Sequence, residues 1–536
     1  MQGELLSNLR ALIALVLLGV SFPALGLAYG RAWRLWAHDG TSKRMVLGAT
    51  AAAAVLRWLI APKQIVTMYI GYLLTEQAIT LSASSHYGMG SLALYHTLFA
   101  LFPRDHQVLL WTNAVVGVLT LPLAAAFAGR LLRDARAGAA FALLVAFTPL
   151  FVRNDTSDAN HVPALWWLMG GLVLWDEFLE TGRRPALVAA TALLALAANG
   201  RPEMPLLVPS LLVLFTVALW PPRARLVRPA VFGAAAVAAV LVLPHALHVV
   251  NAAIALDEQD SLPGTGAGGL VRAARSLLLQ DTVLTPSLYP VALVALALLG
   301  LLAPPPGARR ARLAIAGAAV LWLGVSGLDL CRANMARVHV PGALLVTMLA
   351  GAGAAYVWRR VPGVGGRGAL VLAVVLAALP TARTLWAPTN EQAEEDFIRR
   401  ALSQLPATPY TLVRMDRADR NRASPGSDFT HHHFPDYLVR PPRGPGQVSS
   451  IHDWFAQPDT ARPAFFYLGT RCYAEFRPAD APRPSGDALQ PACERLLREA
   501  KLQPVLEAVV PNRGDVWLEY YGDAPTLRLG LYQLAP

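Results

Sequence analysis

The sequence has few charged residues and few cysteines. Only 15% of its 536 residues are Asp, Glu, Lys or Arg, whereas about a quarter is usual in soluble proteins. Three cysteines are too few for a disulfide-rich scaffold. With 55% hydrophobic residues, the chain is also too apolar to be disordered. These values argue against a soluble multidomain protein.

The sequence instead contains a series of apolar runs of roughly 17–22 residues, the length that crosses a hydrocarbon core. They predict a polytopic α-helical membrane protein with about twelve transmembrane helices, within a range of 11–13. A shorter apolar run at 89–102 is interpreted as interfacial or re-entrant. The predicted spans are 11–28, 45–61, 107–129, 137–152, 161–178, 185–199, 204–220, 229–250, 286–303, 311–328, 338–358 and 368–384.

The net charge of +11 does not indicate a nucleic-acid partner, because the basic excess lies among the apolar runs. Residues 385–536 carry 17 Lys/Arg and 19 Asp/Glu, a net charge of −2. The remaining 29 Lys/Arg and 16 Asp/Glu lie in residues 1–384 and give +13. Membrane topology explains such a distribution, since cytoplasmic loops are enriched in Lys and Arg.

The positive-inside bias predicts the orientation. One set of alternate loops holds 18 Lys/Arg in 55 residues, and the opposite set holds 8 in 101. The poorer set and the C-terminal region are therefore expected outside the cytoplasm. Twelve spans would also place the N-terminus outside, although the first apolar run could instead be interfacial. That run is long for a cleaved signal peptide, and the strongest basic cluster follows it. The predicted outer loops include 62–106, 153–160, 251–285 and 329–337.

Residues 385–536 differ in composition from the preceding membrane domain, residues 1–384. Apolar runs shorten, and the proportions of proline and charge rise. We predict a small extracytoplasmic α/β domain with a long loop over 416–446 and a Cys472–Cys493 disulfide, which would persist outside the cytoplasm. Its predicted elements are strands at Thr411–Met415, Ala464–Leu468 and Val516–Tyr521, and a helix at Ala492–Glu499.

The first outer loop offers one candidate catalytic group. Glu76 is the only carboxylate between Ala61 and Pro103, among Tyr, Thr, Gln and His side chains. A partly desolvated carboxylate can act as a general base. The alternative is a solvated glutamate at the membrane surface.

The second outer loop carries Asp155, Asp158 and His161 at intervals of three residues. On a helical turn such residues share one face, and two carboxylates with an imidazole can bind Mg²⁺ or Mn²⁺. They could equally hydrogen-bond sugar hydroxyls. The alternative is helix capping, since Asp is favoured at the N-cap of an apolar helix.

Arginines on the outer side are candidates for binding phosphate. Arg201 and Glu203 occupy a short turn between two spans, and Arg332 and Arg337 lie in the loop 329–337. A guanidinium binds phosphate through two parallel hydrogen bonds. The alternatives are a salt-bridged turn at Arg201 and snorkelling of the other two side chains to the interface.

Taken in order, several short motifs resemble the integral-membrane glycosyltransferases of the C superfold, which include protein mannosyltransferases and lipid A aminoarabinose transferases. The resemblance covers about residues 45–384. The motifs are His86-Tyr87-Gly88-Met89-Gly90, Leu94-Tyr95-His96, Trp111-Thr112-Asn113 through Gly117, Arg130 through Thr148-Pro149, Leu194 through Arg201-Pro202-Glu203, and Arg337-Val338-His339-Val340-Pro341.

This resemblance implies inverting transfer of a sugar from a polyprenyl-phosphate carrier to an extracytoplasmic acceptor: a glycan, a lipid or a protein. The family's base is an acidic residue near the start of the first outer loop, whereas Glu76 lies about fifteen residues beyond the span. Either Glu76 is therefore the base, or Asp158 or Asp155 takes this role, or the activity is lost. The residues expected to bind substrate or phosphate are Arg201, Glu203, Arg332, Arg337, His339, Tyr87 and His86.

The resemblance also implies an apolar groove between spans for the polyprenyl tail and a location in the bacterial inner membrane. No cofactor is required by the sequence beyond the Mg²⁺ or Mn²⁺ considered above. Two other functions remain open: a transporter of lipid-linked glycans, and an assembly factor whose working part is the C-terminal domain.

Overall fold

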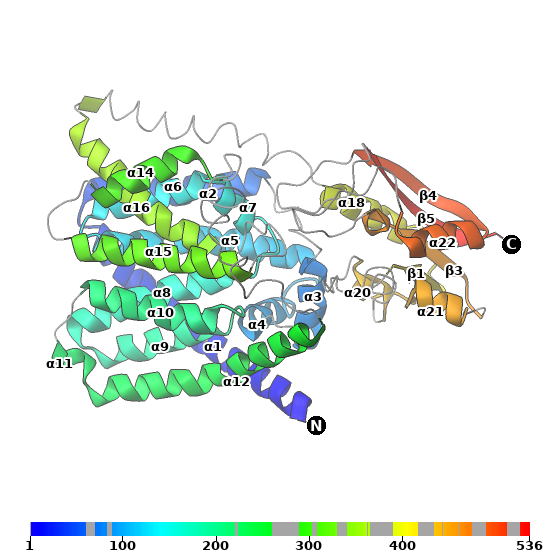
Figure 1. The fold of residues 1–536 in the computed structure, drawn as a ribbon, viewed down its shortest axis with the longest axis horizontal. Helices are drawn as coiled ribbons and strands as arrows, with labels where there is room; N and C mark the ends of the chain where they lie inside the picture. Colours follow the sequence, from blue (N-terminus) through cyan, green and yellow to red (C-terminus); the bar gives the residue numbers. More distant parts are fainter. Residues whose placement is uncertain are drawn as a thin grey trace.

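A computed structural model shows a helical bundle with a smaller sheet-containing domain at one end (Figure 1). Helices α3, α18 and α20 lie where the two parts meet (Figure 1). The residues that the structure describes are 2–60, 70–82, 88–219, 223–259, 289–302, 308–329, 340–361, 363–364, 390–415, 434–441, 443–459, 461–473, 489–511 and 526–535.

The helices of the bundle coincide with the apolar runs of the sequence up to residue 358. Their apolar side chains form one continuous core, from Ala14 in the first helix to Ala355 in the last. The helices are α1 (Gln2–Trp36), α2 (Gly40–Ile60), α3 (Ile70–Thr80), α4 (Met89–Leu98), α5 (His106–Leu131), α6 (Ala135–Phe147), α7 (Pro149–Asp155), α8 (His161–Thr181), α9 (Arg184–Ala198), α10 (Met204–Leu219), α11 (Arg223–Leu226), α12 (Pro229–Gln259), α14 (Val291–Leu302), α15 (Arg309–Asp329) and α16 (Val340–Arg360).

Among the described residues, five helical segments are long and apolar enough to cross a membrane. They are Leu6–Trp36, His106–Leu131, His161–Thr181, Pro229–Val250 and Val340–Arg360. A multi-pass membrane protein is therefore confirmed, while the number of twelve spans stays a prediction. The predicted span 368–384 lies outside the described residues.

The predicted span 137–152 is broken. Helices α6 and α7 meet at an angle of 67° and together pass the criteria for a sixth span. The break falls at Thr148-Pro149, where Pro149 is the first residue of α7. Because proline lacks an N–H and fixes φ, it suits a helix start and ends the helix before it. The bend brings the end of α7 and the following loop over the bundle core.

The C-terminal part forms a five-stranded mixed sheet in the order β2-β1-β3-β5-β4. β1 runs parallel to β2 and β3, whereas β5 is antiparallel to β3 and β4. The elements are α18 (Asn390–Leu402), β1 (Thr411–Arg414), α20 (Asp436–Val439), β2 (Gln447–Ser450), α21 (Ile451–Ala456), β3 (Ala464–Leu468), α22 (Pro491–Glu499), β4 (Leu502–Pro511) and β5 (Thr526–Leu534).

Helices cover both faces of this sheet. Phe397 of α18 packs on one face with Leu412 and Phe465. On the other face Phe466 packs with Cys472 and Cys493, which form a disulfide with a Cα–Cα distance of 5.7 Å. Part of the predicted loop 416–446 is helical, since α20 lies within it, and the predicted strand Val516–Tyr521 lies outside the described residues.

Candidate functional site

The loop Thr156–Asn160 lies within the predicted second outer loop, 153–160. The side chain of Asn113 holds it through two hydrogen bonds. The Asn113 amide donates hydrogen bonds to the carbonyl oxygens of Ser157 (2.7 Å) and Ala159 (3.2 Å). Its own oxygen accepts one from Tyr95 Oη at 2.8 Å. Asn113 and Tyr95 belong to the short motifs in the sequence, and their role is to shape this loop.

Asp158 is buried at the beginning of α3. Its Oδ2 accepts a hydrogen bond from the Gly71 backbone N–H at 2.5 Å. A carboxylate at a helix N-terminus is stabilised by the unpaired N–H groups and the helix dipole. Asp158 therefore fixes the position of α3, the helix that carries Glu76.

Asp155 lies in a different environment from Asp158. Arg57 of α2 donates to Asp155 Oδ2 from Nε (2.9 Å) and Nη2 (2.5 Å), and both side chains are buried. Gly117 provides the space, because a Cβ there would lie 2.3 Å from the Asp155 carboxyl carbon. The charged partner of Asp155 is therefore Arg57 of a distant helix, 98 positions earlier in the chain.

The predicted face of Asp155, Asp158 and His161 does not form either. The helix ends at Asp155 and a new one begins at His161, so the three residues do not share a continuous helical turn. Their partners are Arg57, Gly71 and Glu203 respectively. Within the described part of the chain, no group of three His, Cys, Asp or Glu side chains is placed to hold a metal ion.

A polar cluster surrounds Arg201 in the turn between α9 and α10. Its guanidinium donates to Glu203 Oε1 (2.9 Å) and to Asn160 Oδ1 (2.7 Å). His161 Nε2 reaches the same Glu203 oxygen at 2.8 Å. Burial alone would raise the pKa of Glu203, but Arg201 and His161 outweigh it and hold this pKa below the ordinary value. The salt-bridged turn considered for Arg201 is therefore present, and it extends to the second outer loop.

Two residues that the sequence reasoning missed complete this cluster. His245 of α12 contacts the Arg201 carbonyl oxygen through Nε2 at 3.1 Å, and Arg10 of α1 lies 3.4 Å from its Nδ1. Because a guanidinium can only donate, Nδ1 is the acceptor, and Nε2–H donates to Arg201. Both side chains are buried. The sequence did contain a signal for these two residues. Arg10 directly precedes the apolar run 11–28, and His245 lies inside the run 229–250, where a polar side chain is costly in a membrane.

The N-terminus of α4 also reaches this turn. The Gly90 N–H donates to the Asn199 carbonyl oxygen at 2.9 Å. A Cβ at Gly88 would lie 2.1 Å from that oxygen, so the approach requires glycine. Helices α4, α8 and α10 thus begin close to the Arg201 cluster, and the N-terminal ends of helices favour anions.

Glu76 lies on α3 and faces the C-terminal domain. Arg440, which directly follows α20, contacts Glu76 Oε1 through Nη1 at 3.3 Å. The Glu76 side chain is 28% exposed to solvent, whereas Asp158 is buried. Each of the three candidate carboxylates therefore contacts a different partner: Arg57 for Asp155, Gly71 for Asp158 and Arg440 for Glu76.

A buried polar joint, centred on His106, connects the two domains beside α3. His106 Nδ1 contacts Tyr437 Oη at 2.9 Å, and Nε2 contacts Glu395 Oε1 at 2.8 Å. Arg399 reaches Glu395 (3.0 Å) and Asp105 (3.3 Å). Burial would raise the pKa of Asp105 and of Glu395, but His106 and Arg399 overcome this and lower both pKa values. No local pattern marks this joint, because its members in the membrane domain and those in the C-terminal domain are about 290–330 residues apart.

An apolar cavity of about 410 Å³ lies between helices α8, α9, α10 and α12. Two of the residues that line this cavity, Ala198 and Pro205, flank the turn that contains Arg201. A third, Val242, lies one helical turn before His245 on α12. The cavity is lined by Trp175, Leu187, Ala190, Thr191, Leu194, Ala195, Ala198, Pro205, Val208, Pro209, Leu212, Val231, Ala234, Ala235, Ala238, Ala239 and Val242.

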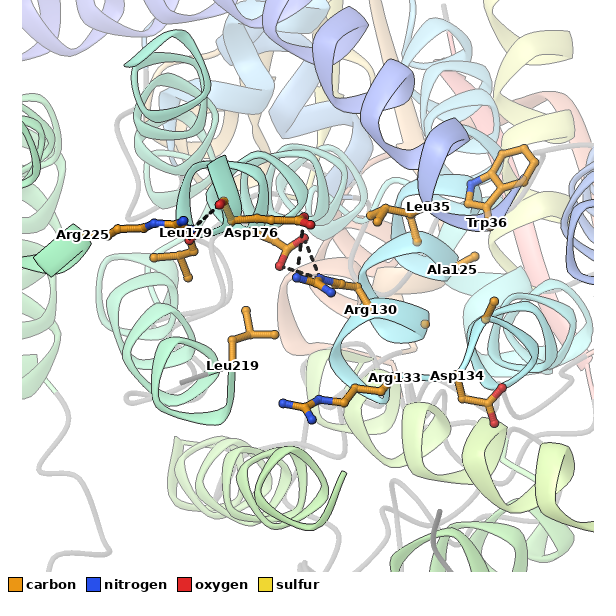
Figure 2. A pocket seen from close by; sticks show the side chains of 14 residues that line it. Leu35, Trp36, Ala125, Arg130, Arg133, Asp134, Asp176, Leu179, Leu219 and Arg225 are labelled. Atoms are coloured by element: carbon orange, nitrogen blue, oxygen red, sulfur yellow. Dashed lines mark hydrogen bonds and ion pairs between the residues drawn. The ribbon is translucent and has the colours of Figure 1, made fainter. Parts of the chain in front are cut away.

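A second cavity, of about 670 Å³, opens at the opposite end of the bundle, where the basic loops lie. Figure 2 shows Arg130 and Asp176 joined by an ion pair among the residues that line it, with Arg225 beside Leu179. Arg31 and Arg130 pair with Asp176 and Glu180, so the carboxylates here are neutralised by arginines. This arrangement joins α1, α5 and α8 and is structural.

Several predicted site residues lie outside the described residues. They are His86, Tyr87, Arg332, Arg337 and His339. Their roles in binding substrate or phosphate remain predictions.

Comparison with known proteins supports the resemblance noted from the motifs. Residues 89–248 match the model of the dolichyl-phosphate-mannose-protein mannosyltransferase family. This segment contains α4 to most of α12, and so includes the second outer loop and the Arg201 turn. No curated protein sequence matches the chain.

The fold is similar to that of ArnT from Cupriavidus metallidurans, solved with bound undecaprenyl phosphate. The TM-score is 0.50 at 13% identity, covering 92% of this chain and 99% of ArnT. The resemblance to membrane glycosyltransferases of the C superfold is thus confirmed at the level of the fold.

Two structures of the oligosaccharyltransferase from Archaeoglobus fulgidus also match, at lower TM-scores. The apo form has a TM-score of 0.46 at 12% identity, covering 82% of this chain and 71% of that one. The complex of AglB with an inhibitory peptide and a dolichol-phosphate has a TM-score of 0.42 at 14% identity, covering 70% and 63%.

Proposed function

We propose that this protein is a membrane glycosyltransferase that moves a sugar from a polyprenyl-phosphate donor to an extracytoplasmic acceptor hydroxyl with inversion. One observation carries the proposal: the short loop Thr156–Asn160 connects a candidate phosphate site to the helix that bears the candidate base. Asn160 binds Arg201, and Asp158 binds the start of α3. The family match over 89–248 and the ArnT-like fold support the same class of reaction.

The donor phosphate is assigned to the Arg201 cluster. Among the described residues of the cluster, Arg201 and Arg10 supply two guanidinium groups and Glu203 supplies one carboxylate, so these three groups together carry net positive charge. Positive charge fixed in a buried site stabilises a departing phosphate more effectively than it would in water. The adjoining apolar cavity is assigned to the polyprenyl tail, because a lipid with an anionic head requires an apolar channel beside a cationic site.

Glu76 is assigned as the general base. Its partly exposed carboxylate can meet an acceptor from outside, whereas Asp155 is engaged by Arg57 and Asp158 is buried under α3. Glu76 would accept the proton of the acceptor hydroxyl while that oxygen forms a bond to the anomeric carbon. The bond from this carbon to the phosphate oxygen breaks, and the polyprenyl phosphate leaves with its electron pair.

The test is purification of the full chain with native lipids, followed by mass spectrometry of the lipids retained. We expect polyprenyl-phosphate sugars with the wild type and a large reduction with Arg201→Gln. Arg133→Ala is the matched control, because Arg133 is exposed at the opposite end of the bundle. Wild-type protein without such lipids, and without transfer from added polyprenyl-phosphate mannose, would overturn the proposal.

A further inference from the structure

Helix α20 lies against α3, which belongs to the predicted first outer loop. Tyr437 packs with Tyr72 of α3, and Leu438 and Ile79 pack around this pair. Arg440 follows at the end of α20 and reaches Glu76, which lies one turn beyond Tyr72 on the same helix. Residues four apart share a helix face, so one face of α3 meets both the aromatic contact and the arginine.

The position of Arg440 is determined by the sheet. Its Nη2 lies 3.5 Å from Asp436 Oδ2, and Asp436 is itself buried. Arg414, the last residue of β1, donates to Asp436 Oδ1 from Nε at 2.8 Å and to Oδ2 from Nη2. A continuous chain of charges therefore runs from a central strand through Asp436 and Arg440 to Glu76.

The joint around His106 fixes this chain relative to the membrane domain. Tyr437 contacts both the ring Nδ1 and the backbone N–H of His106, the first residue of α5. Glu395 and Arg399 of α18 hold the same point from the other side. Rigid-body movement of the C-terminal domain would break several buried hydrogen bonds, so the structure favours one position of Arg440.

The Arg440–Glu76 ion pair has little value as a stabilising contact. The arginine side chain is 48% exposed, and ion pairs in such surroundings contribute little to folding. Its effect on Glu76 is geometric, since a guanidinium beside one carboxylate oxygen restricts the orientation of the group. A catalytic base must be held in reach of its proton, and small displacements are costly in rate.

We infer that Arg440 is a positioning residue that orients Glu76, and that the C-terminal domain thereby completes the active site in the first outer loop. This inference rests on the proposed role of Glu76 as base. It assigns the domain a part in the chemistry that neither its sequence nor the family match indicates, since the match ends at residue 248.

The experiment compares Arg440→Ala and Arg440→Lys with Arg443→Ala in the full chain, reconstituted in liposomes with polyprenyl-phosphate mannose as the probe. Arg443 is an exposed arginine three residues further along the same segment and serves as the matched control. We expect kcat to fall about ten-fold or more in Arg440→Ala with the KM for the donor little changed. Lysine should restore part of the rate, and Arg443→Ala should resemble the wild type.

The Glu76→Gln background provides the decisive comparison. If Arg440 acts through Glu76, adding Arg440→Ala to Glu76→Gln should cause no further loss, because coupled residues are not additive. A further ten-fold loss would overturn the inference, as would equal rates for Arg440→Ala and Arg443→Ala.

A second measurement does not depend on turnover. In a Glu76→Cys/Arg440→Cys variant, a short bifunctional maleimide should cross-link the two positions, whereas neither single variant should show this cross-link, and its absence from the double variant would contradict the contact. If the cross-link forms but the wild type transfers no sugar, the contact stands while the proposed function and the catalytic part of the inference fail.

Discussion

Arg57 and Asp155 form a buried ion pair between α2 and the end of α7, with distances of 2.9 and 2.5 Å from two guanidinium nitrogens to one carboxylate oxygen. Arg57 also donates to the Ala146 carbonyl oxygen at 3.2 Å, close to the break between α6 and α7. The pair therefore holds the bent span against its neighbour. It also satisfies the charge of Arg57, which from the sequence alone looked like an isolated cation within a span.

Breaking the Arg57–Asp155 pair should mainly lower the stability of the folded protein rather than the transfer rate. Removal of one partner of a buried ion pair leaves an uncompensated charge and costs about 3–5 kcal/mol. We expect Asp155→Ala to lower the apparent melting temperature in detergent by several degrees or more. Arg57→Met with Asp155→Leu should recover part of the loss. Wild-type stability in the single variant would contradict the structural role assigned to the pair.

Glu76→Gln and Asp158→Asn should separate the two remaining carboxylates. Loss of a general base typically reduces the rate by about 10²–10⁴, and we expect this for Glu76→Gln with unchanged donor retention. Asp158→Asn should instead loosen α3, because an amide replaces the carboxylate that accepts the Gly71 N–H. Hydrogen exchange of α3 and the transfer rate, measured on the same preparations, distinguish the two effects.

If both variants keep wild-type rates, neither carboxylate is the base and the assignment of Glu76 fails. If instead the wild type itself transfers no sugar, a transporter of lipid-linked glycans accounts better for the fold, because transport across the bilayer needs no proton acceptor at Glu76. Measurement of lipid translocation in liposomes would test that alternative directly.

A bulky side chain inside the apolar cavity between α8, α9, α10 and α12 should exclude the polyprenyl tail that we propose binds there. Ala238 lines it from α12, whereas the neighbouring Val237 is exposed on the same helix. We expect Ala238→Phe to reduce the amount of polyprenyl lipid that co-purifies, because the added ring occupies the space between α9 and α12. Val237→Phe, an equally bulky change on the outer surface, should retain the lipid. Equal retention by both variants would place the tail elsewhere.

Docking of the C-terminal domain should weaken in acid. The pKa values of Asp105 and Glu395 are lowered in the folded protein from ordinary values of 3.8 and 4.5. Their contribution is therefore fully present above about pH 5 and is lost as the pH falls through the lowered values. Glu395→Gln removes a charged hydrogen-bond partner of His106 and should cost about 1.5–3 kcal/mol at pH 7.

The measurement is the apparent melting temperature of wild type and Glu395→Gln between pH 4 and 8. We expect the difference between them to be largest near neutrality and to shrink towards pH 4. Glu499→Gln is the control, since Glu499 pairs only with neighbours on its own surface helix among the contacts described. A difference that grows in acid would contradict the assignment.

The order of apolar runs determined the membrane class and the positions of the helices. Each run must satisfy its backbone hydrogen bonds internally and bury or expose its side chains to lipid, which only a helix can do. The break at Thr148-Pro149 could also have been predicted from the sequence, because proline fixes its own φ angle and lacks the N–H that would continue the preceding helix. The strands Ala464–Leu468 and Thr411–Arg414 followed from short apolar runs in a polar region.

The motifs indicated the family resemblance, but their physical roles depended on tertiary contacts. Asn113, Tyr95 and Gly88 are supporting residues, which shape the loop at Ser157 and the turn at Asn199. The sequence correctly singled out Arg201 and Glu203 as a turn with paired charges. It could not supply Arg10 and His245, because nothing local marks which polar residues of separate spans meet.

The partners of the candidate carboxylates were decided by the tertiary structure alone. The spacing of Asp155, Asp158 and His161 suggested one face, yet the helix ends at Asp155 and each side chain turns to a different element. Glu76 meets an arginine 364 positions away. Local propensity and periodicity act over a few residues, whereas pairing of buried or half-buried charges is set by which elements the fold brings together. The proposed base, the arginine proposed to orient it and the joint between the domains therefore depend on the three-dimensional arrangement of this chain.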